Sequence, residues 1–306
     1  MKVKSKGRNW KHYLPFYFMG LPGMLYLLIN NYLPLTGLQI AFKDFKYNLG
    51  IWGSEWTGFK NFKFLFSTGD AFIMIRNTLL YNIVWIILGI VVGVGAAILL
   101  NEIHSVIKKK VYQTLILMPY LMSMVVISYL AYAYLAPETG LFNGVLKTLG
   151  MEPVNFYLEK GWWPFILTFV NQWRGIGFGM ILYLSSIVGI DPSLYEAAQL
   201  DGATKWQRHM RITIPLLKPT IIMLFIMNVG NIFRSDFGLF YQVPMNQGAL
   251  YSVTQTIDTY VYRALLQRND IAMSSAASFI QSIVGFAFIM LANYIVRKYD
   301  ENSSLF

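Results

Sequence analysis

Cysteine is absent from the 306-residue chain, and histidine occurs only three times. Without cysteine, the chain cannot form disulfides, use a thiol nucleophile or bind zinc through sulfur. His12, His104 and His209 lie far apart in the sequence, so we do not expect a histidine metal site. Charged residues make up 13% of the chain, which is about half the usual fraction in soluble domains.

Recognisable catalytic motifs are also missing. The sequence contains no Gly-x-x-x-x-Gly-Lys-Ser/Thr phosphate loop, no His-Glu-x-x-His pattern and no nucleophile elbow. ATP binding through a phosphate loop and the hydrolytic reactions of the other two motifs are therefore not expected. We predict no catalytic residues, no metal and no cofactor on this chain, and hence no enzyme.

Hydrophobic residues, in contrast, make up 56% of the chain, and they fall in runs of about twenty, the length that crosses a bilayer as a helix. The pattern predicts an all-α integral membrane protein with six transmembrane helices, the third of them kinked at Pro119. The predicted spans are residues 14–33, 77–100, 112–136, 163–187, 219–233 and 275–296.

The net charge of +10 is distributed at the ends of these runs. That pattern is typical of membrane orientation, so no nucleic-acid partner is expected. Lys108-Lys109-Lys110 and Arg297-Lys298 mark the inner side, which predicts that both termini are cytoplasmic. The predicted organisation is a basic N-terminus (1–13), a first span (14–33), an extracytoplasmic connection (34–76), a five-span core (77–297) and a cytoplasmic tail (298–306).

A polar stretch at residues 191–219 interrupts the apolar runs and has the signals of a short soluble helix. Asp191 can cap the helix, and Pro192 suits its first position. Gly202 suits the left-handed residue that ends a helix, and a second turn can restart at Thr204. This stretch is predicted to be a docking helix presented to a cytoplasmic partner.

Within this stretch, Glu196-Ala197-Ala198, Asp201-Gly202-Ala203 and Ile214-Pro215 resemble the EAA loop of permease subunits of binding-protein-dependent ABC importers. The flanking Trp206 and Lys218-Pro219 resemble the carbohydrate branch, which includes the maltose-type permeases and the oligosaccharide permeases of Gram-positive bacteria. The resemblance implies the type I permease fold, in the plasma membrane of a Gram-positive bacterium. Pro215 and Pro219 are expected to begin the fifth span.

The resemblance also implies an assembly. A second homologous permease subunit, two ATPase subunits carrying Mg-ATP and an extracellular solute-binding protein are the expected partners, besides membrane lipid and a sugar substrate. The implied coupling residues, which would seat in a groove on the ATPase, are Tyr195, Glu196, Ala197, Ala198, Asp201, Gly202, Ala203 and Pro215.

Polar residues inside the predicted spans are candidates for the substrate path. Arg174 is the most unusual, because an uncompensated charge within a membrane helix costs ~2.5 kcal/mol or more. It is either a snorkelling side chain or structural ion pair, or part of the path, where Trp173 would offer a flat face to a sugar. Amides in the spans either line the path or hydrogen-bond to other helices. The candidates are Asn171, Gln172, Trp173, Arg174, Asn228, Asn231 and Gln281.

The nature of the solute stays open at this point. The resemblance favours an oligosaccharide, whereas composition fits a peptide or an amino acid nearly as well, and Arg174 would favour an acidic sugar. A stand-alone secondary carrier or a membrane enzyme is the alternative from another class. No Asp or Glu lies within a predicted span, which argues against proton or sodium coupling.

Overall fold

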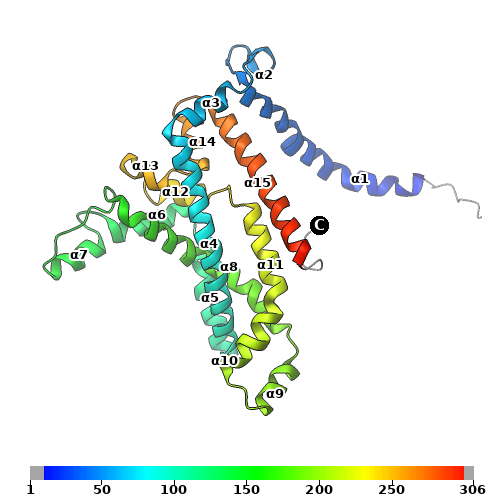
Figure 1. Cartoon of the computed structure of the whole chain (residues 1–306), viewed down its shortest axis with the longest axis vertical. Helices are drawn as coiled ribbons and strands as arrows, with labels where there is room; N and C mark the ends of the chain where they lie inside the picture. Colours follow the sequence, from blue (N-terminus) through cyan, green and yellow to red (C-terminus); the bar gives the residue numbers. More distant parts are fainter. Residues whose placement is uncertain (1–9, 300–306) are drawn as a thin grey trace, which may run out of the picture.

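The computed structural model describes residues 10–299. Residues 1–9 of the predicted basic N-terminus and 300–306 of the predicted tail lie outside the described residues. The chain is almost entirely helical, with a single two-stranded antiparallel sheet, β1 (Lys43–Asp44) against β2 (Glu55–Trp56), in the described part. Figure 1 shows the long helices α4, α5, α8, α11 and α15 forming the body of the molecule.

The N-terminal region is one helical arm that changes its winding along its length. It consists of α1 (Trp10–Leu27), a π-helical turn (Leu28–Tyr32) and a 3-10 segment (Leu33–Phe42). After the small sheet and α2 (Gly50–Gly53), α3 (Lys60–Ser67) leads into the body. Figure 1 shows α1 standing away from the other helices, and its apolar side chains are exposed.

The remaining long helices occur where apolar spans were predicted, with different limits. They are α4 (Gly69–Asn101), α5 (Val106–Leu121), α6 (Met124–Leu135), α8 (Trp163–Val188), α11 (Ile214–Gly230) and α15 (Ile271–Tyr299). α4 begins eight residues before the predicted Asn77. Shorter elements join them: α7 (Leu141–Thr148), a 3-10 turn (Lys160–Trp162), α9 (Pro192–Leu200) and α10 (Lys205–Arg208), then α12 (Phe237–Gln242), a 3-10 turn (Gly248–Leu250), α13 (Tyr251–Thr254) and α14 (Ile257–Leu266).

The break in the third predicted span lies beyond Pro119. The chain bends by 98° between α5 and α6, because Met122 and Ser123 are extended and the Ser123 side chain accepts a hydrogen bond from the Val126 N–H, which caps a new helix. Pro119 itself lies inside α5. The predicted kink is therefore a full change of direction, and its cause is the serine cap.

The fifth predicted span begins earlier than its prolines indicate. The helical run is continuous from Lys205 to Gly230, with Pro215 in the first turn of α11 and Pro219 inside it. A π-helical turn, His209–Thr213, directly precedes α11, whose second residue is Pro215. This wider winding accommodates a residue that has no N–H to donate, so the prolines do not end the helix.

Two glycines allow the helices of the body to approach closely. α8 packs along both α4 and α5. At Gly93 of α4, an added Cβ would lie 3.1 Å from the Tyr183 ring of α8, and at Gly177 of α8 it would lie 2.5 Å from the Ile116 carbonyl oxygen of α5. No side chain fits at Gly177 unless the α5 backbone moves.

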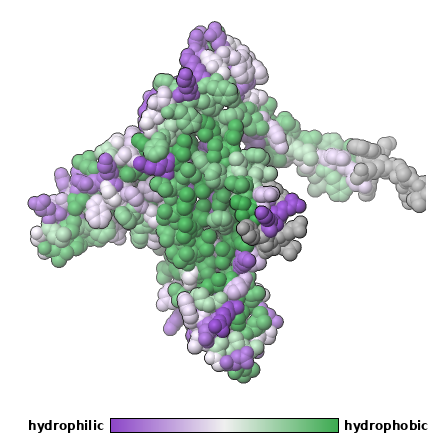
Figure 2. Space-filling model, viewed as in Figure 1, coloured by the Kyte–Doolittle hydropathy of each residue, from purple (hydrophilic) through white to green (hydrophobic). Residues whose placement is uncertain are grey.

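The surface of the body is apolar between two polar ends (Figure 2). Within residues 10–299, three helical runs are long and apolar enough to cross a membrane: α4, Lys205–Gly230 and Ile271–Lys298. Counting each bent pair, α5 with α6 and Lys160–Val188 with α9, as one span gives up to five. The predicted first span, 14–33, is not among them, since α1 includes Lys11 and His12 and two prolines.

Candidate functional site

α9 forms as its sequence signals predict. The Asp191 carboxylate accepts a hydrogen bond from the Ser193 N–H at 2.9 Å, and Pro192 occupies the first helical position. At the other end, Ala203 N–H donates to the Ala198 carbonyl, and Gly202 has a φ of 78°. This left-handed C-terminal motif favours glycine because other residues are strained there.

α10 follows directly and is also capped. Thr204 and Gln207 form a reciprocal capping box, in which each side chain bonds to the other residue's backbone N–H. The surface formed by α9 and α10, which we call the coupling segment (191–208), exposes Glu196, Ala197 and Asp201. Its apolar side chains Leu200 and Trp206 are 90% and 68% exposed, so this segment has an uncovered apolar and acidic face.

The other sequence-predicted coupling residues differ in how exposed they are. Tyr195, Ala198 and Ala203 are half-buried, whereas Gly202 and Pro215 are exposed. The Tyr195 hydroxyl hydrogen-bonds to the Thr213 hydroxyl at 2.9 Å. Tyr195 therefore ties α9 to the π-helical turn that leads into α11.

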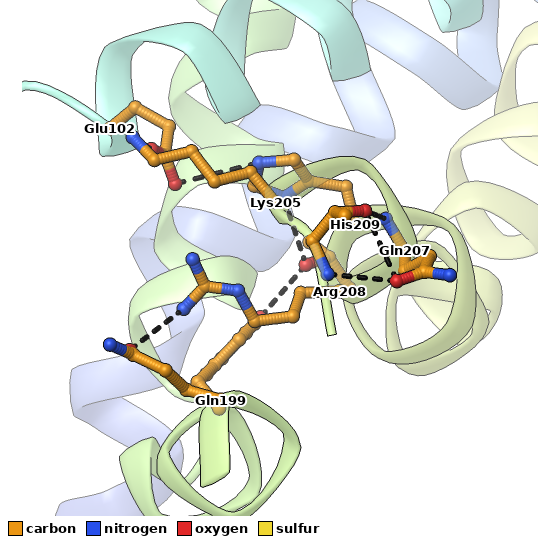
Figure 3. A network of polar contacts seen from close by, with 9 residues as sticks. Glu102, Gln199, Lys205, Gln207, Arg208 and His209 are labelled. Carbon is orange, nitrogen blue, oxygen red and sulfur yellow. Dashed lines mark hydrogen bonds and ion pairs between the residues drawn. The ribbon is translucent and has the colours of Figure 1, made fainter. Parts of the chain in front are cut away.

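A second attachment joins the coupling segment to the C-terminal end of α4 (Figure 3). Lys205 Nζ lies 2.7 Å from the Glu102 carboxylate, and His209 Nε2 lies 3.4 Å from its other oxygen. Arg208 donates to the Gln199 side chain at 3.4 Å, which joins α10 to α9. The end of α4, α9, α10 and the π-helical turn (His209–Thr213) thus meet in one polar cluster around a cavity of about 130 Å³.

Sequence reasoning missed Glu102 and His209 in this cluster. The hydrogen bond from Lys205 is the first cause that lowers the pKa of Glu102, and the nearby charge of His209 contributes in the same direction. Glu102 could have been noticed in the sequence, because it is the sole carboxylate between the second predicted span and Lys108.

A second region of interest is a cavity of about 810 Å³ between α4, α8 and α11. Of the sequence-predicted path residues, Asn171, Gln172, Asn228 and Asn231 line it. Asn82, Phe178 and Arg234, which are not among the sequence-predicted path residues, also line it. Asn228 and Asn231 use their amide N–H groups on the helix backbone one turn earlier, at 2.8 and 3.0 Å, which leaves their oxygens to face the cavity or solvent.

The three other candidates do not line this cavity. Trp173 is partly buried and packs against the hydrophobic cluster around Trp163 and Phe240. Arg174 forms an ion pair with Asp236 at 2.8 Å, both side chains being about one-third exposed or less. Arg174 was interpreted either as a snorkelling side chain or structural ion pair, or as part of the substrate path. The observed geometry corresponds to the structural ion pair.

Gln281 also has a structural role in this chain. Its amide donates to the Phe233 carbonyl at 2.7 Å and to the Asp258 carboxylate at 3.1 Å. It lines a separate cavity of about 270 Å³, which shares Asn231 and Arg234 with the larger one. Gln281 therefore holds the segment beside the main cavity in place.

Together, the apolar helices, the amide-lined cavity and the capped polar coupling segment at one end are typical of membrane transport subunits. The chain belongs to the family of binding-protein-dependent transport system inner membrane components, whose model matches residues 86–301. It is thus the permease subunit of an ABC importer, a component of the inner membrane.

Named relatives extend the match over nearly the whole chain. Protein LplB of Bacillus subtilis is 34% identical over 97% of this chain and 94% of its own. The polygalacturonan/rhamnogalacturonan transport system permease protein YteP of Bacillus subtilis is 36% identical over 93% of this chain and 88% of its own. A solved bacterial ABC transporter involved in the import of the acidic polysaccharide alginate matches with a TM-score of 0.87 and 33% identity, covering 95% of this chain and 97% of that one.

Proposed function

We propose that this permease translocates an oligosaccharide that an extracellular binding protein delivers. The cavity supports a hydroxyl-rich solute, because three helices contribute polar side-chain amides to its lining, from Asn82, Asn171, Gln172, Asn228 and Asn231. Similarity to YteP and to the alginate importer supports the same substrate class.

The proposed assembly contains a second homologous permease subunit, two ATPase subunits carrying Mg-ATP and the binding protein. This chain contributes six spans, the first at 14–33, with both termini in the cytoplasm of a Gram-positive bacterium. The arm formed by α1 packs against lipid and the second permease subunit, which gives its exposed apolar side chains a covering. ATP hydrolysis takes place on the partners.

The observation that carries the proposal is the continuous helix from Lys205 to Gly230. Its first residues belong to the coupling segment, and Asn228 near its end lines the cavity. When the ATPase pair closes, it moves the coupling segment, and this helix carries the motion to the cavity wall. Alternating access then follows as rigid-body rocking of the flanking helices.

Copurification tests the docking role. The chain is purified from its native membrane as wild type, as Glu196→Lys and as Glu152→Lys, which makes the same charge change in an exposed outer loop. We expect the ATPase pair to accompany the wild type and Glu152→Lys, and to be lost from, or uncoupled in, Glu196→Lys. If no ATPase accompanies the wild type, or if all three behave alike, the coupling segment is not the docking site.

A further inference from the structure

We propose that the solute carries carboxylate groups and that Arg234 binds one of them in the cavity, so that the permease is specific for acidic, uronic-acid-type oligosaccharides. This inference rests on the proposed oligosaccharide function and makes it narrower. Nothing in the sequence motifs points to Arg234, which lies just beyond the end of α11.

The backbone that carries Arg234 is fixed from two sides. The Asn82 amide of α4 donates to the carbonyls of Ile232 and Arg234, at 2.9 and 2.8 Å. On the other side, the N–H and the hydroxyl of Ser235 both donate to the Asp258 carboxylate, at 2.6 and 2.7 Å. The Arg234 side chain therefore projects from a well-held turn.

The guanidinium of Arg234 itself has no partner. Within residues 10–299, no hydrogen bond, ion pair or ring contact engages it, while it lines both the 810 Å³ cavity and the smaller one beside it. Two other arginines show the contrast: Arg76 donates to the Ser252 carbonyl, and Arg263 lies 4.0 Å from the Tyr251 ring. Arg234 is thus an exposed cation on a fixed backbone, and its side chain has no partner in the described chain.

The charge balance of the cavity leaves this cation uncompensated. Asp236 is the sole carboxylate among the residues that line the cavity in the described chain, and Arg174 neutralises it at 2.8 Å. Asp258 lies behind the turn, outside the lining, and accepts its hydrogen bonds from Ser235 and Gln281. Of the two charged groups in the lining, Asp236 is therefore paired with Arg174 from outside the lining, whereas Arg234 has no partner in the described chain and can attract an anionic group of the solute.

The surroundings fit a carboxylated sugar. A guanidinium binds a carboxylate through two parallel hydrogen bonds, and the amides of Asn228 and Asn231 next to it match hydroxyl groups. Phe178 of α8 supplies an exposed ring to the lining of the same cavity, held by stacking on Tyr120 with 5.1 Å between ring centroids. A sugar ring can lie on that face while its carboxylate reaches a cation.

The test uses the complete importer in proteoliposomes, with its own ATPases and binding protein. Two labelled probes are compared, a galacturonic-acid oligosaccharide and the carboxyl-reduced, neutral form of equal length. The variants are Arg234→Gln, Arg234→Lys and the control Arg268→Gln, an exposed outer arginine that does not line the cavity. Because every sample contains the same binding protein, differences between variants belong to this chain.

We expect the wild type and Arg268→Gln to transport the acidic probe. Arg234→Gln should lower its transport about tenfold or more, equivalent to about 1.4 kcal/mol, and Arg234→Lys should lower it less. Transport of the neutral probe at saturation, and ATP hydrolysis without solute, should be the same in Arg234→Gln and in wild type.

Three results would overturn the inference. These are unchanged transport of the acidic probe by Arg234→Gln, an equal loss for both probes, and a wild type that transports the neutral probe alone. The last result leaves the oligosaccharide function intact. If neither probe, nor any other saccharide, is transported or stimulates ATP hydrolysis, the proposed function itself fails.

Discussion

Arg174 is tolerated inside a membrane protein because a carboxylate from a distant part of the chain meets it. Asp236 pairs with it at 2.8 Å and at the same time accepts the Leu239 N–H as the cap of α12. One carboxylate thus neutralises a charge and begins a helix. The pair joins α8 to the segment that carries Arg234.

Replacing Arg174 by Met should destabilise the protein by roughly 1–3 kcal/mol, because it leaves the Asp236 charge without its partner. In the double variant Arg174→Met with Asp236→Asn, the uncompensated charge is gone and the asparagine still caps α12. Thermal unfolding in detergent should therefore show partial recovery in the double variant. A double variant less stable than Arg174→Met would contradict this account.

Glu102 should matter more for coupling than for stability. Exposed ion pairs contribute about 0–1 kcal/mol, so Glu102→Gln should change the melting temperature little. It removes the charged link between α4 and Lys205, and we expect weaker stimulation of ATP hydrolysis by the loaded binding protein. Full stimulation in Glu102→Gln would show that this link does not transmit motion.

The same residue gives a pH dependence. Since the folded state lowers the pKa of Glu102 below its ordinary value of 4.5, its stabilising contribution is complete above that pH and is lost as the pH falls toward the folded-state pKa. The small difference in melting temperature between wild type and Glu102→Gln should shrink as the pH is lowered below 4.5. A difference that stays constant with pH would argue against the ion pair.

At the scale of elements, helix approach depends on a few glycines. Gly177→Ala would put a Cβ against the Ile116 carbonyl oxygen, and overpacking of this kind costs about 1–3 kcal/mol. Gly175→Ala is the matched control, two residues away on α8 with no atom within 4 Å of the added Cβ. We expect a lower melting temperature for Gly177→Ala alone. Equal behaviour of the two would show that α5 shifts easily.

A structural feature of this chain could be predicted from the sequence when the residues that determine it lie close together in the sequence. The ends of α9 could be predicted because Asp191, Pro192 and Gly202 act within their own few residues. The break after Leu121 was misplaced because proline is a stronger sequence signal than the serine cap that causes it. Arg174 and Glu102 are paired with residues 62 and 103 positions away in the sequence. The Arg234 side chain has no partner in the described chain. Local sequence patterns indicate neither a distant partner nor the lack of one.

At the scale of the whole molecule, the absence of cysteine makes the proposed orientation directly testable. A cysteine introduced at exposed His104, between α4 and α5, should react with a membrane-impermeant thiol reagent only after the cells are opened. A cysteine at exposed Glu152, after α7, should react in intact cells. The reverse pattern would place the coupling segment outside and exclude an ATPase as its partner.

The unbroken helix from Lys205 to Gly230 also has a mechanical consequence. At 1.5 Å per residue, its 26 residues span about 39 Å, so a tilt of roughly 10° at one end displaces the other by about 7 Å. That displacement exceeds the reach of a hydrogen bond. The displacement would break the hydrogen bonds between Asn228 and a bound solute in one movement. A small closure of the ATPase pair would then release the solute from this residue.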